Sequence, residues 1–333
     1  MRTPVHSYRL AEGWGQLPVG MIMGEVGGVA VDSGDRVYVY NRGADPMIVF
    51  DRDGNFLRTW GQDRFKRPHG IHIGPDDAVY LTDEGSHKVS KFTPEGELLM
   101  EIATPSPFMA GRPFNRCTHT ALSPSGNIYV SDGYGNAHVH IFTPEGKHLH
   151  TWGGPGSDPG QFNLPHNIVC DEDGWVYVAD RENHRIQVFD GTGRYETQWN
   201  NMHRPCALCM SKGPDPVFYV GELGPVLAVN RAFPNLGPRL SMINRAGTLL
   251  ARYGHEKPGL GENQFIAPHG LAVDSRGDLY VGEASYAAWP QLFPDKEMPA
   301  QLRVFRKLVR IRSDQDKPAP VRLASNATQA VSP

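Results

Sequence analysis

Short stretches in which apolar and polar residues alternate recur along the chain, separated by turns that contain glycine. The stretch VYVAD at 176–180 is typical, and it has the length and period of a half-buried β-strand. Glycine and proline provide 37 and 28 of the 333 residues, which favours many short strands joined by turns over a few long helices. The pattern therefore predicts an all-β protein.

Six segments of the chain align with one another at a spacing of about 40 to 60 residues. Each copy contains a short strand, a turn, a second strand and, in most copies, a third strand and an outer strand that ends near Trp-Gly. One such antiparallel sheet cannot bury both faces alone, so six copies predict a six-bladed β-propeller. The copies begin at Gly27, His69, Thr118, His166, Cys206 and His269.

The two ends of the repeat region complement each other. The segment 302–312 supplies only the third strand of the last copy, whereas YRLAEGWGQLP at 8–18 resembles the outer strand of another copy. We therefore expect the N-terminal strand to complete the last blade, because closure removes exposed sheet edges. This predicts a single propeller domain over residues 1–313 and a disordered C-terminal tail over 314–333, which is polar and contains proline.

Charge and hydropathy argue against several classes of partner. The formal net charge is −3, and no run of Lys or Arg provides the basic surface that nucleic acids require. No stretch approaches the ~20 apolar residues that span a bilayer, and the first residues lack the apolar core of a signal peptide. We expect a soluble, cytoplasmic monomer. Four cysteines fall within predicted strands and are expected to be buried thiols: Cys117, Cys170, Cys206 and Cys209.

The first residue of each copy lies where the innermost strand begins. Copies two, four and six have histidine there, His69, His166 and His269, and a proline precedes each of them. Alternate blades of a six-fold ring are about 120° apart, so the three imidazoles are expected to meet on the central axis. Three nitrogen ligands and one open position form a typical catalytic zinc site, although iron, cobalt or copper would also suit three imidazoles.

A second ring of residues follows the second strand of each copy. We interpret Glu84 and Glu222 as solvated turn residues. Arg42, Tyr134 and Arg181 differ, because they would surround the metal with two cations and one phenol, and nearby positive charge favours the phenolate. The complete ring is Arg42, Glu84, Tyr134, Arg181, Glu222 and Glu283.

The string VYVADRENHRIQVF in the fourth copy resembles the NHL repeat. The strings YNRG, RPHGI, SDGYGN, LPHNI and APHGL, over about residues 25 to 285, resemble the peptidyl-α-hydroxyglycine α-amidating lyases in order and in placement within the copies. The resemblance implies that the three histidines bind a catalytic zinc and that Tyr134 is the essential tyrosine. It further implies that Arg42 and Arg181 are the two arginines of the active site.

The resemblance also implies a structural calcium ion, held partly by backbone carbonyls of Val29 and Ile71. Three positions depart from the family. Gly270 stands where the family has a calcium-binding aspartate, so the calcium site is expected to be weak or empty. Ala267 replaces a methionine and widens the pocket wall, and Gly135 replaces a cysteine, so the disulfide of the family cannot form.

His119 directly follows Thr118, the first residue of the third copy. It either faces the channel and contacts substrate or packs within the blade, and both interpretations stay open.

The implied activity is that of a zinc-dependent lyase, which breaks the C–N bond of a small-molecule or peptide-like α-hydroxyamide to give an amide and an aldehyde such as glyoxylate. Tyr134 would act as the base, and Arg42 or Arg181 would bind a substrate carboxylate. Three alternatives use the same scaffold. They are a metal-dependent lactonase or other hydrolase, a non-enzymatic NHL interaction propeller, and a magnesium-dependent lyase of the streptogramin kind.

Overall fold

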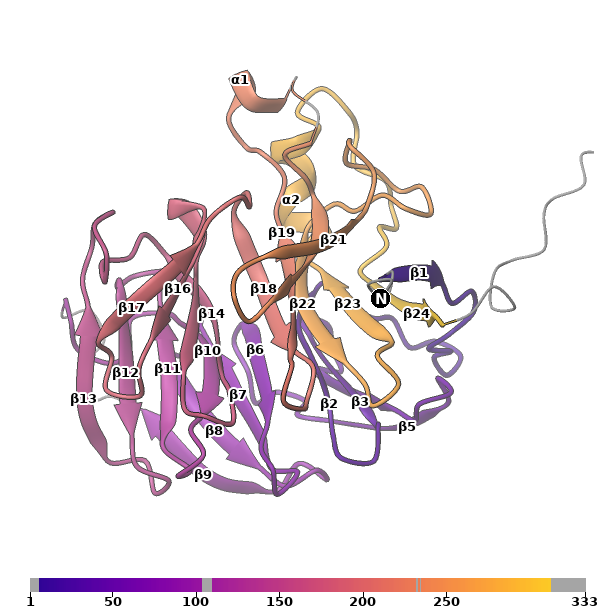
Figure 1. The fold of residues 1–333 in the computed structure, drawn as a ribbon. Coiled ribbons are helices and arrows are strands. Elements are labelled where there is room, and N and C mark those ends of the chain that lie inside the picture. The colour runs from indigo at the N-terminus through magenta and orange to yellow at the C-terminus, as the bar shows by residue number, and fades with distance from the viewer. Residues whose placement is uncertain (1–5, 104–109, 232, 234, 313–333) are drawn as a thin grey trace, which may run out of the picture.

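The computed structural model describes residues 6–103, 110–231, 233 and 235–312. They form a six-bladed β-propeller in which every blade is a four-stranded antiparallel sheet, as the sequence predicts (Figure 1). The tail predicted at 314–333 lies outside the described residues. The innermost strands surround the axis and are β2 (Val26–Val31), β6 (Pro68–Ile73), β10 (Cys117–Leu122), β14 (Pro165–Cys170), β18 (Pro205–Met210) and β22 (Pro268–Val273).

The second and third strands carry most of the buried apolar side chains, because both of their faces are covered by neighbouring blades. The second strands are β3 (Val37–Asn41), β7 (Val79–Asp83), β11 (Ile128–Asp132), β15 (Val176–Asp180), β19 (Val217–Glu222) and β23 (Leu279–Glu283). The third strands are β4 (Met47–Phe50), β8 (Lys88–Phe92), β12 (His138–Phe142), β16 (Arg185–Phe189), β20 (Arg239–Asn244) and β24 (Phe305–Ile311).

The outer strands are more polar, and three of them contact the next blade through a tryptophan, namely Trp60, Trp152 or Trp199. Trp60 lies against Gly96 of the second blade, so closely that a Cβ atom on this glycine would be 2.6 Å from the indole. Gly96 has a φ of +93°, which glycine adopts without strain. The outer strands are β5 (Phe56–Trp60), β9 (Leu98–Ala103), β13 (His148–Gly153), β17 (Tyr195–Trp199), β21 (Leu249–Tyr253) and β1 (Ser7–Leu10).

The N-terminal strand completes the last blade, as expected. β1 pairs antiparallel with β24, with Tyr8 opposite Arg310 and Leu10 opposite Leu308. The sixth sheet therefore has the order β1-β24-β23-β22 and joins the two ends of the described chain.

Short helices interrupt the all-β pattern. α1 (Ala228–Arg231) lies between β19 and β20, and α2 (Ser285–Leu292) lies between β23 and β24. Figure 1 shows both beyond one end of the propeller, over the fifth and sixth blades. The single turn η1 (Arg181–Asn183) follows β15. Within the described part of the chain, every helix is too short to cross a lipid bilayer.

Candidate metal centre and active site

The three histidines of the even-numbered blades meet on the axis, as the alternating pattern predicts. They are the second residues of β6, β14 and β22, and the imidazole centroids of His69, His166 and His269 are each 4.8 Å from the other two. All three residues are buried, and their possible ligand atoms lie within 4.8 Å of one another. The three side chains thus form a group that can hold a metal ion.

The odd-numbered blades orient these imidazoles through backbone carbonyls. Each histidine places its Nδ1 against the carbonyl oxygen of the residue that begins the repeat copy in the following blade. This contact fixes Nδ1 as the protonated nitrogen and leaves Nε2 as the ligand atom. In the sequence, these three residues are only the copy starts that lack histidine, and nothing in it indicated their role as hydrogen-bond acceptors. The distances are 2.6 Å from His69 to Thr118, 2.9 Å from His166 to Cys206 and 2.7 Å from His269 to Gly27.

Burial keeps the three imidazoles neutral. It lowers the pKa of His69 and of His166 well below the usual value, and the neighbouring imidazoles lower both further. Burial and the charge of Arg42 lower the pKa of His269 to about 3. Because metal ions bind deprotonated imidazole, three buried neutral rings with converging Nε2 atoms fit a transition-metal ion.

Tyr134 reaches the histidines from the turn after β11. Its hydroxyl oxygen is 3.1 Å from Nε2 of His69 and 3.1 Å from Nε2 of His166. Burial raises the pKa of Tyr134, and the charges of Arg181 and Arg42 offset only part of this increase. The sequence-based expectation of a more acidic phenol combined these charges with that of a bound metal and left out burial, which among the protein groups is the larger effect on the pKa of Tyr134.

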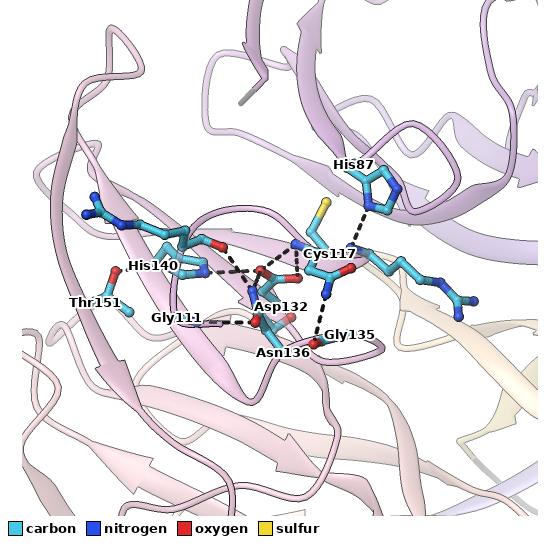
Figure 2. Close-up of polar contacts among 12 residues, drawn as sticks. His87, Gly111, Cys117, Asp132, Gly135, Asn136, His140 and Thr151 are labelled. Carbon is cyan, nitrogen blue, oxygen red and sulfur yellow. Dashed lines mark hydrogen bonds and ion pairs between the residues drawn. The ribbon is translucent and has the colours of Figure 1, made fainter. Parts of the chain in front are cut away.

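A hydrogen-bond network around Asp132 positions the Tyr134 turn (Figure 2). The Asp132 carboxylate accepts the backbone N–H of Asn115 at 2.9 Å, the side chain of Asn136 at 2.7 Å and Nε2 of His140 at 3.1 Å. Asn115 in turn donates to the carbonyl of Gly135 at 3.0 Å. A Cβ atom at Gly135 would lie 2.3 Å from Cγ of Asn115, so this packing requires glycine where the family has cysteine.

The same contact occurs in every blade. The last residue of the second strand accepts a backbone N–H from the segment that leads into the first strand, which fixes the loops that surround the axis. The six pairs are Asn41 with Gly24, Asp83 with Arg67, Asp132 with Asn115, Asp180 with Asn163, Glu222 with His203, and Glu283 with Ile266.

Arg42 and Arg181 lie beside Tyr134, as expected. Arg42 donates through Nε to the Pro68 carbonyl at 3.0 Å and pairs with Glu25 at 2.5 Å. Arg181 pairs with Glu182 at 2.8 Å, and its Nη1 is 3.5 Å from the Tyr134 hydroxyl. Both guanidinium groups are thereby held at the histidine centre.

These residues line a cavity of about 230 Å³, which we call the mouth pocket. Sequence reasoning missed two further arginines in its wall, Arg67 and Arg204. Each precedes the proline that begins an innermost strand, as the residue before Pro68 or Pro205, and this position was a signal that could have identified them. Among the described residues that line the pocket, none is acidic. The lining is Arg42, Arg67, Tyr134, Arg181, Arg204, Leu223, Gly224, Val226, Ile266, Ala267, His269, Ala284, Ala287, Ala288, Gln291 and Leu292.

Glu84 and Glu222 are buried, and the interpretation of both as solvated residues is wrong. Glu84 pairs with Arg116 at 2.7 Å and also with Arg67, and Glu222 pairs with Arg239 at 2.9 Å. The burial of these carboxylates is compensated by their arginine partners, so their role is to stabilise the loops.

His119 does not line the mouth pocket. It lies in a second cavity, of about 10 Å³, which is lined by Gly27, Gly28, Val29, His69, His119, His166, Asn167, His269, Gly270 and Leu271 and which we call the inner cavity. Its Nδ1 is 2.9 Å from the Thr120 carbonyl oxygen. Because the inner cavity has room for about one water molecule, the structure does not support the substrate contact considered for His119.

The inner cavity is where the implied calcium ion would bind, since Val29 lines it. The residues present do not fit that ion. Among the described residues of the lining, none carries a carboxylate, which is the ligand that calcium prefers. A Cβ atom at Gly270 would be 2.8 Å from Cα of Gly28, so an aspartate there would require the backbone to move. The backbone of Ile71, the other implied ligand, interacts instead with the His119 ring.

Comparison with known proteins agrees with this architecture. The NHL repeat model matches residues 162–189. Human NHL repeat-containing protein 3 is 35% identical, and the alignment covers 85% of this chain and 83% of that protein.

Two further relatives are amidating enzymes. Peptidyl-glycine alpha-amidating monooxygenase B of Xenopus laevis is 30% identical over 84% of this chain, which spans 35% of that protein. Peptidyl-alpha-hydroxyglycine alpha-amidating lyase 1 of Drosophila melanogaster is 29% identical, over 69% of this chain and 45% of the relative. Among solved structures, virginiamycin B lyase from Staphylococcus aureus superposes with a TM-score of 0.55 at 17% identity, over 79% of each chain. This last likeness concerns the fold alone.

Proposed function

Since this chain belongs to the NHL-repeat propeller family, which includes NHL repeat-containing protein 3 and the peptidyl-α-hydroxyglycine α-amidating lyases, we propose that it is a zinc-dependent lyase. Its substrate is a small or peptide-like α-hydroxyamide, R–CO–NH–CH(OH)–R′. The reaction breaks the bond between nitrogen and the carbinol carbon and releases the amide R–CO–NH2 and the aldehyde R′–CHO.

One observation carries the proposal. The Tyr134 hydroxyl lies 3.1 Å from ligand nitrogens of two of the three converging imidazoles, at the mouth pocket. A phenol adjacent to a metal centre and open to a substrate pocket is suited to proton transfer. A buried histidine cluster with a purely structural role would not require the adjoining cavity or the arginines in its wall.

His69, His166 and His269 would hold the zinc ion through Nε2. A bound divalent metal supplies a Lewis acid, which favours the ionised form of a substrate hydroxyl and of the adjacent phenol. The charges of Arg181 and Arg42 act on Tyr134 in the same direction, since both lower its pKa against the effect of burial.

Tyr134 then moves one proton in two steps. Its phenolate oxygen accepts the proton of the substrate hydroxyl, the C–O bond becomes a carbonyl, and the C–N bond breaks with its electron pair on nitrogen. Tyr134 returns the proton to that nitrogen, so that no other acid is consumed. The Arg42 and Arg181 guanidiniums bind a carboxylate on the carbinol carbon, which orients the hydroxyl toward Tyr134.

Metal analysis combined with product detection tests this function. We expect the purified chain to retain about one equivalent of zinc and to release glyoxylate from N-acyl-α-hydroxyglycines. Esters and lactones, offered in parallel, should not be hydrolysed. Stoichiometric metal without aldehyde release would contradict the lyase, and ester hydrolysis would favour the lactonase alternative.

A further inference from the structure

The mouth pocket is lined by two kinds of side chain. One kind is the guanidinium group, which four arginines supply. The other kind is apolar, and most of it comes from two insertions that the repeat pattern does not contain, the segment around α2 and the segment between β19 and α1. Ala267, in the loop before β22, adds a further methyl group. The apolar side chains present methyl, isopropyl and isobutyl groups, and the residues that supply them are Ala267, Ala284, Ala287, Ala288, Leu292, Leu223 and Val226. We call them the apolar wall.

The apolar wall is tied to two arginines of the pocket. One Glu25 carboxylate oxygen accepts the backbone N–H of Ala287 at 2.8 Å, and the other pairs with Arg42 at 2.5 Å. Arg204 donates to the Gly224 carbonyl at 3.1 Å and so attaches the second insertion. A ligand in the pocket therefore meets charged groups and an apolar surface whose relative positions are fixed.

The alanines determine how much room the wall leaves. Ala284 is buried, Ala288 is partly buried and Ala287 is exposed at the opening. Each contributes only a methyl group, so a substrate side chain can lie where a larger residue would otherwise stand. A volume of about 230 Å³ suits a small molecule with one apolar substituent rather than a charged peptide.

We propose that the apolar wall is the subsite for the acyl group of the substrate, and that the preferred substrates are N-acyl-α-hydroxyglycines with a small unbranched apolar acyl group. The inference rests on the proposed function, because it places the carboxylate at Arg42 and Arg181 and the carbinol carbon at Tyr134. The acyl group is then the part that extends toward α2.

A chain-length series tests the subsite. For the zinc-loaded protein, kcat/KM should rise about fourfold per methylene from acetyl to hexanoyl, the factor expected for a methylene group transferred from water to an apolar surface. A succinyl group, which places a carboxylate at the wall, should reverse the gain. Equal kcat/KM across the series, or preference for succinyl, would overturn the proposal.

Two variants localise the effect. Ala288→Phe fills the subsite, and Ala287→Leu fills its opening at an exposed position that tolerates the larger side chain. Both should lower the ratio of hexanoyl to acetyl kcat/KM by about tenfold or more. Ala246→Phe, on the exposed turn between β20 and β21, is the matched control and should leave the ratio unchanged. An unchanged ratio in both wall variants would assign the selectivity elsewhere.

Binding of unreactive analogues separates this inference from the proposed function. N-acylglycines lack the hydroxyl group and cannot be cleaved, so calorimetry measures their affinity without any catalysis. If affinity rises with acyl length while no α-hydroxyamide is cleaved, the subsite stands and the lyase fails. If cleavage occurs but affinity is independent of acyl length, the lyase stands and the subsite fails.

Discussion

The two sides of the histidine triangle share His269 but differ in size and in charge. The mouth pocket, at about 230 Å³, has four arginines in its wall, whereas the inner cavity, at about 10 Å³, is lined by glycines and neutral side chains. Burial lowers the pKa of His119 to about 4, so its imidazole is uncharged at neutral pH. A Cβ atom at Gly70 would be 2.8 Å from the His119 ring, so the ring packs closely against the neighbouring blade.

Of the three histidines, His269 lines both cavities, whereas His69 and His166 line the inner cavity and contact the mouth side through the Tyr134 hydroxyl. In the proposed reaction, substrate would enter from the mouth pocket, where Tyr134 and the guanidiniums lie. The inner side supplies packing and neutral hydrogen bonds. Changes at the shared histidine centre, on the mouth side and on the inner side should therefore have effects of decreasing size.

The largest effect is expected from His166→Ala. Removing one of three ligands should abolish stoichiometric metal binding and lyase activity together, because two imidazoles form an incomplete site. Metal analysis and glyoxylate release measure the two effects. His150→Ala replaces an exposed histidine on β13 and should change neither. Retention of tightly bound metal in the His166 variant would show that the triangle is not the metal centre.

Tyr134→Phe tests the mouth side alone. It removes the proton acceptor and keeps the ring, so kcat should fall about a hundredfold to ten-thousandfold while metal content stays at the level of the unaltered chain. Tyr195→Phe, on the outer strand β17, serves as the control. Near-normal kcat with metal bound would exclude Tyr134 as the base.

Arg42→Gln should have a smaller effect, mainly on KM. The loss of one charged hydrogen bond to the substrate carboxylate predicts a KM about tenfold to a hundredfold higher. A substrate amide in place of the carboxylate should show little difference between variant and unaltered chain. Arg194→Gln, at an exposed guanidinium, controls for the loss of charge. Equal losses for both substrates would mean that Arg42 acts on the fold and not on the carboxylate.

The smallest effect concerns the inner side. Because the inner cavity does not fit calcium, millimolar Ca²⁺ should leave the Tm of the zinc-loaded chain unchanged within about 1 °C, since a ligand stabilises only the protein that binds it. Magnesium at the same concentration is the control for ionic strength. A calcium-specific rise in Tm would show that the neutral lining, Asn167 and backbone carbonyls included, binds the ion after all.

The sequence was sufficient for the features that repeat. Histidine in every second copy predicted the triangle, and the unfinished last copy predicted the pairing of β1 with β24. Tyr134, Arg42 and Arg181 were identified because they occupy one equivalent position in their copies. In a radial repeat, equivalent positions in sequence become neighbours around the axis.

Features outside the repeat were not predictable in the same way. The apolar wall comes mainly from the long connections between the second and third strands of the last two copies, where α1 and α2 lie, and these insertions do not follow the repeat pattern. Burial could not be measured from the sequence. The solvation of Glu84 and Glu222 was therefore misjudged, and the rise that burial causes in the pKa of Tyr134 was left out. The side on which His119 lies depends on the room that Gly70 leaves in the neighbouring blade, a contact between different copies.

The bond from His269 to the Gly27 carbonyl, at 2.7 Å, joins the sixth blade to the first. The candidate metal centre therefore spans the boundary between the first and the last blade. His269 is correctly oriented only when these two blades are in contact. Binding of a metal ion to the three histidines and closure of the ring of blades must then favour each other, because the ion binds only the closed state. Chelation should loosen this boundary together with the two others that a ligand imidazole bridges, and detachment of β1 should weaken metal binding from a distance.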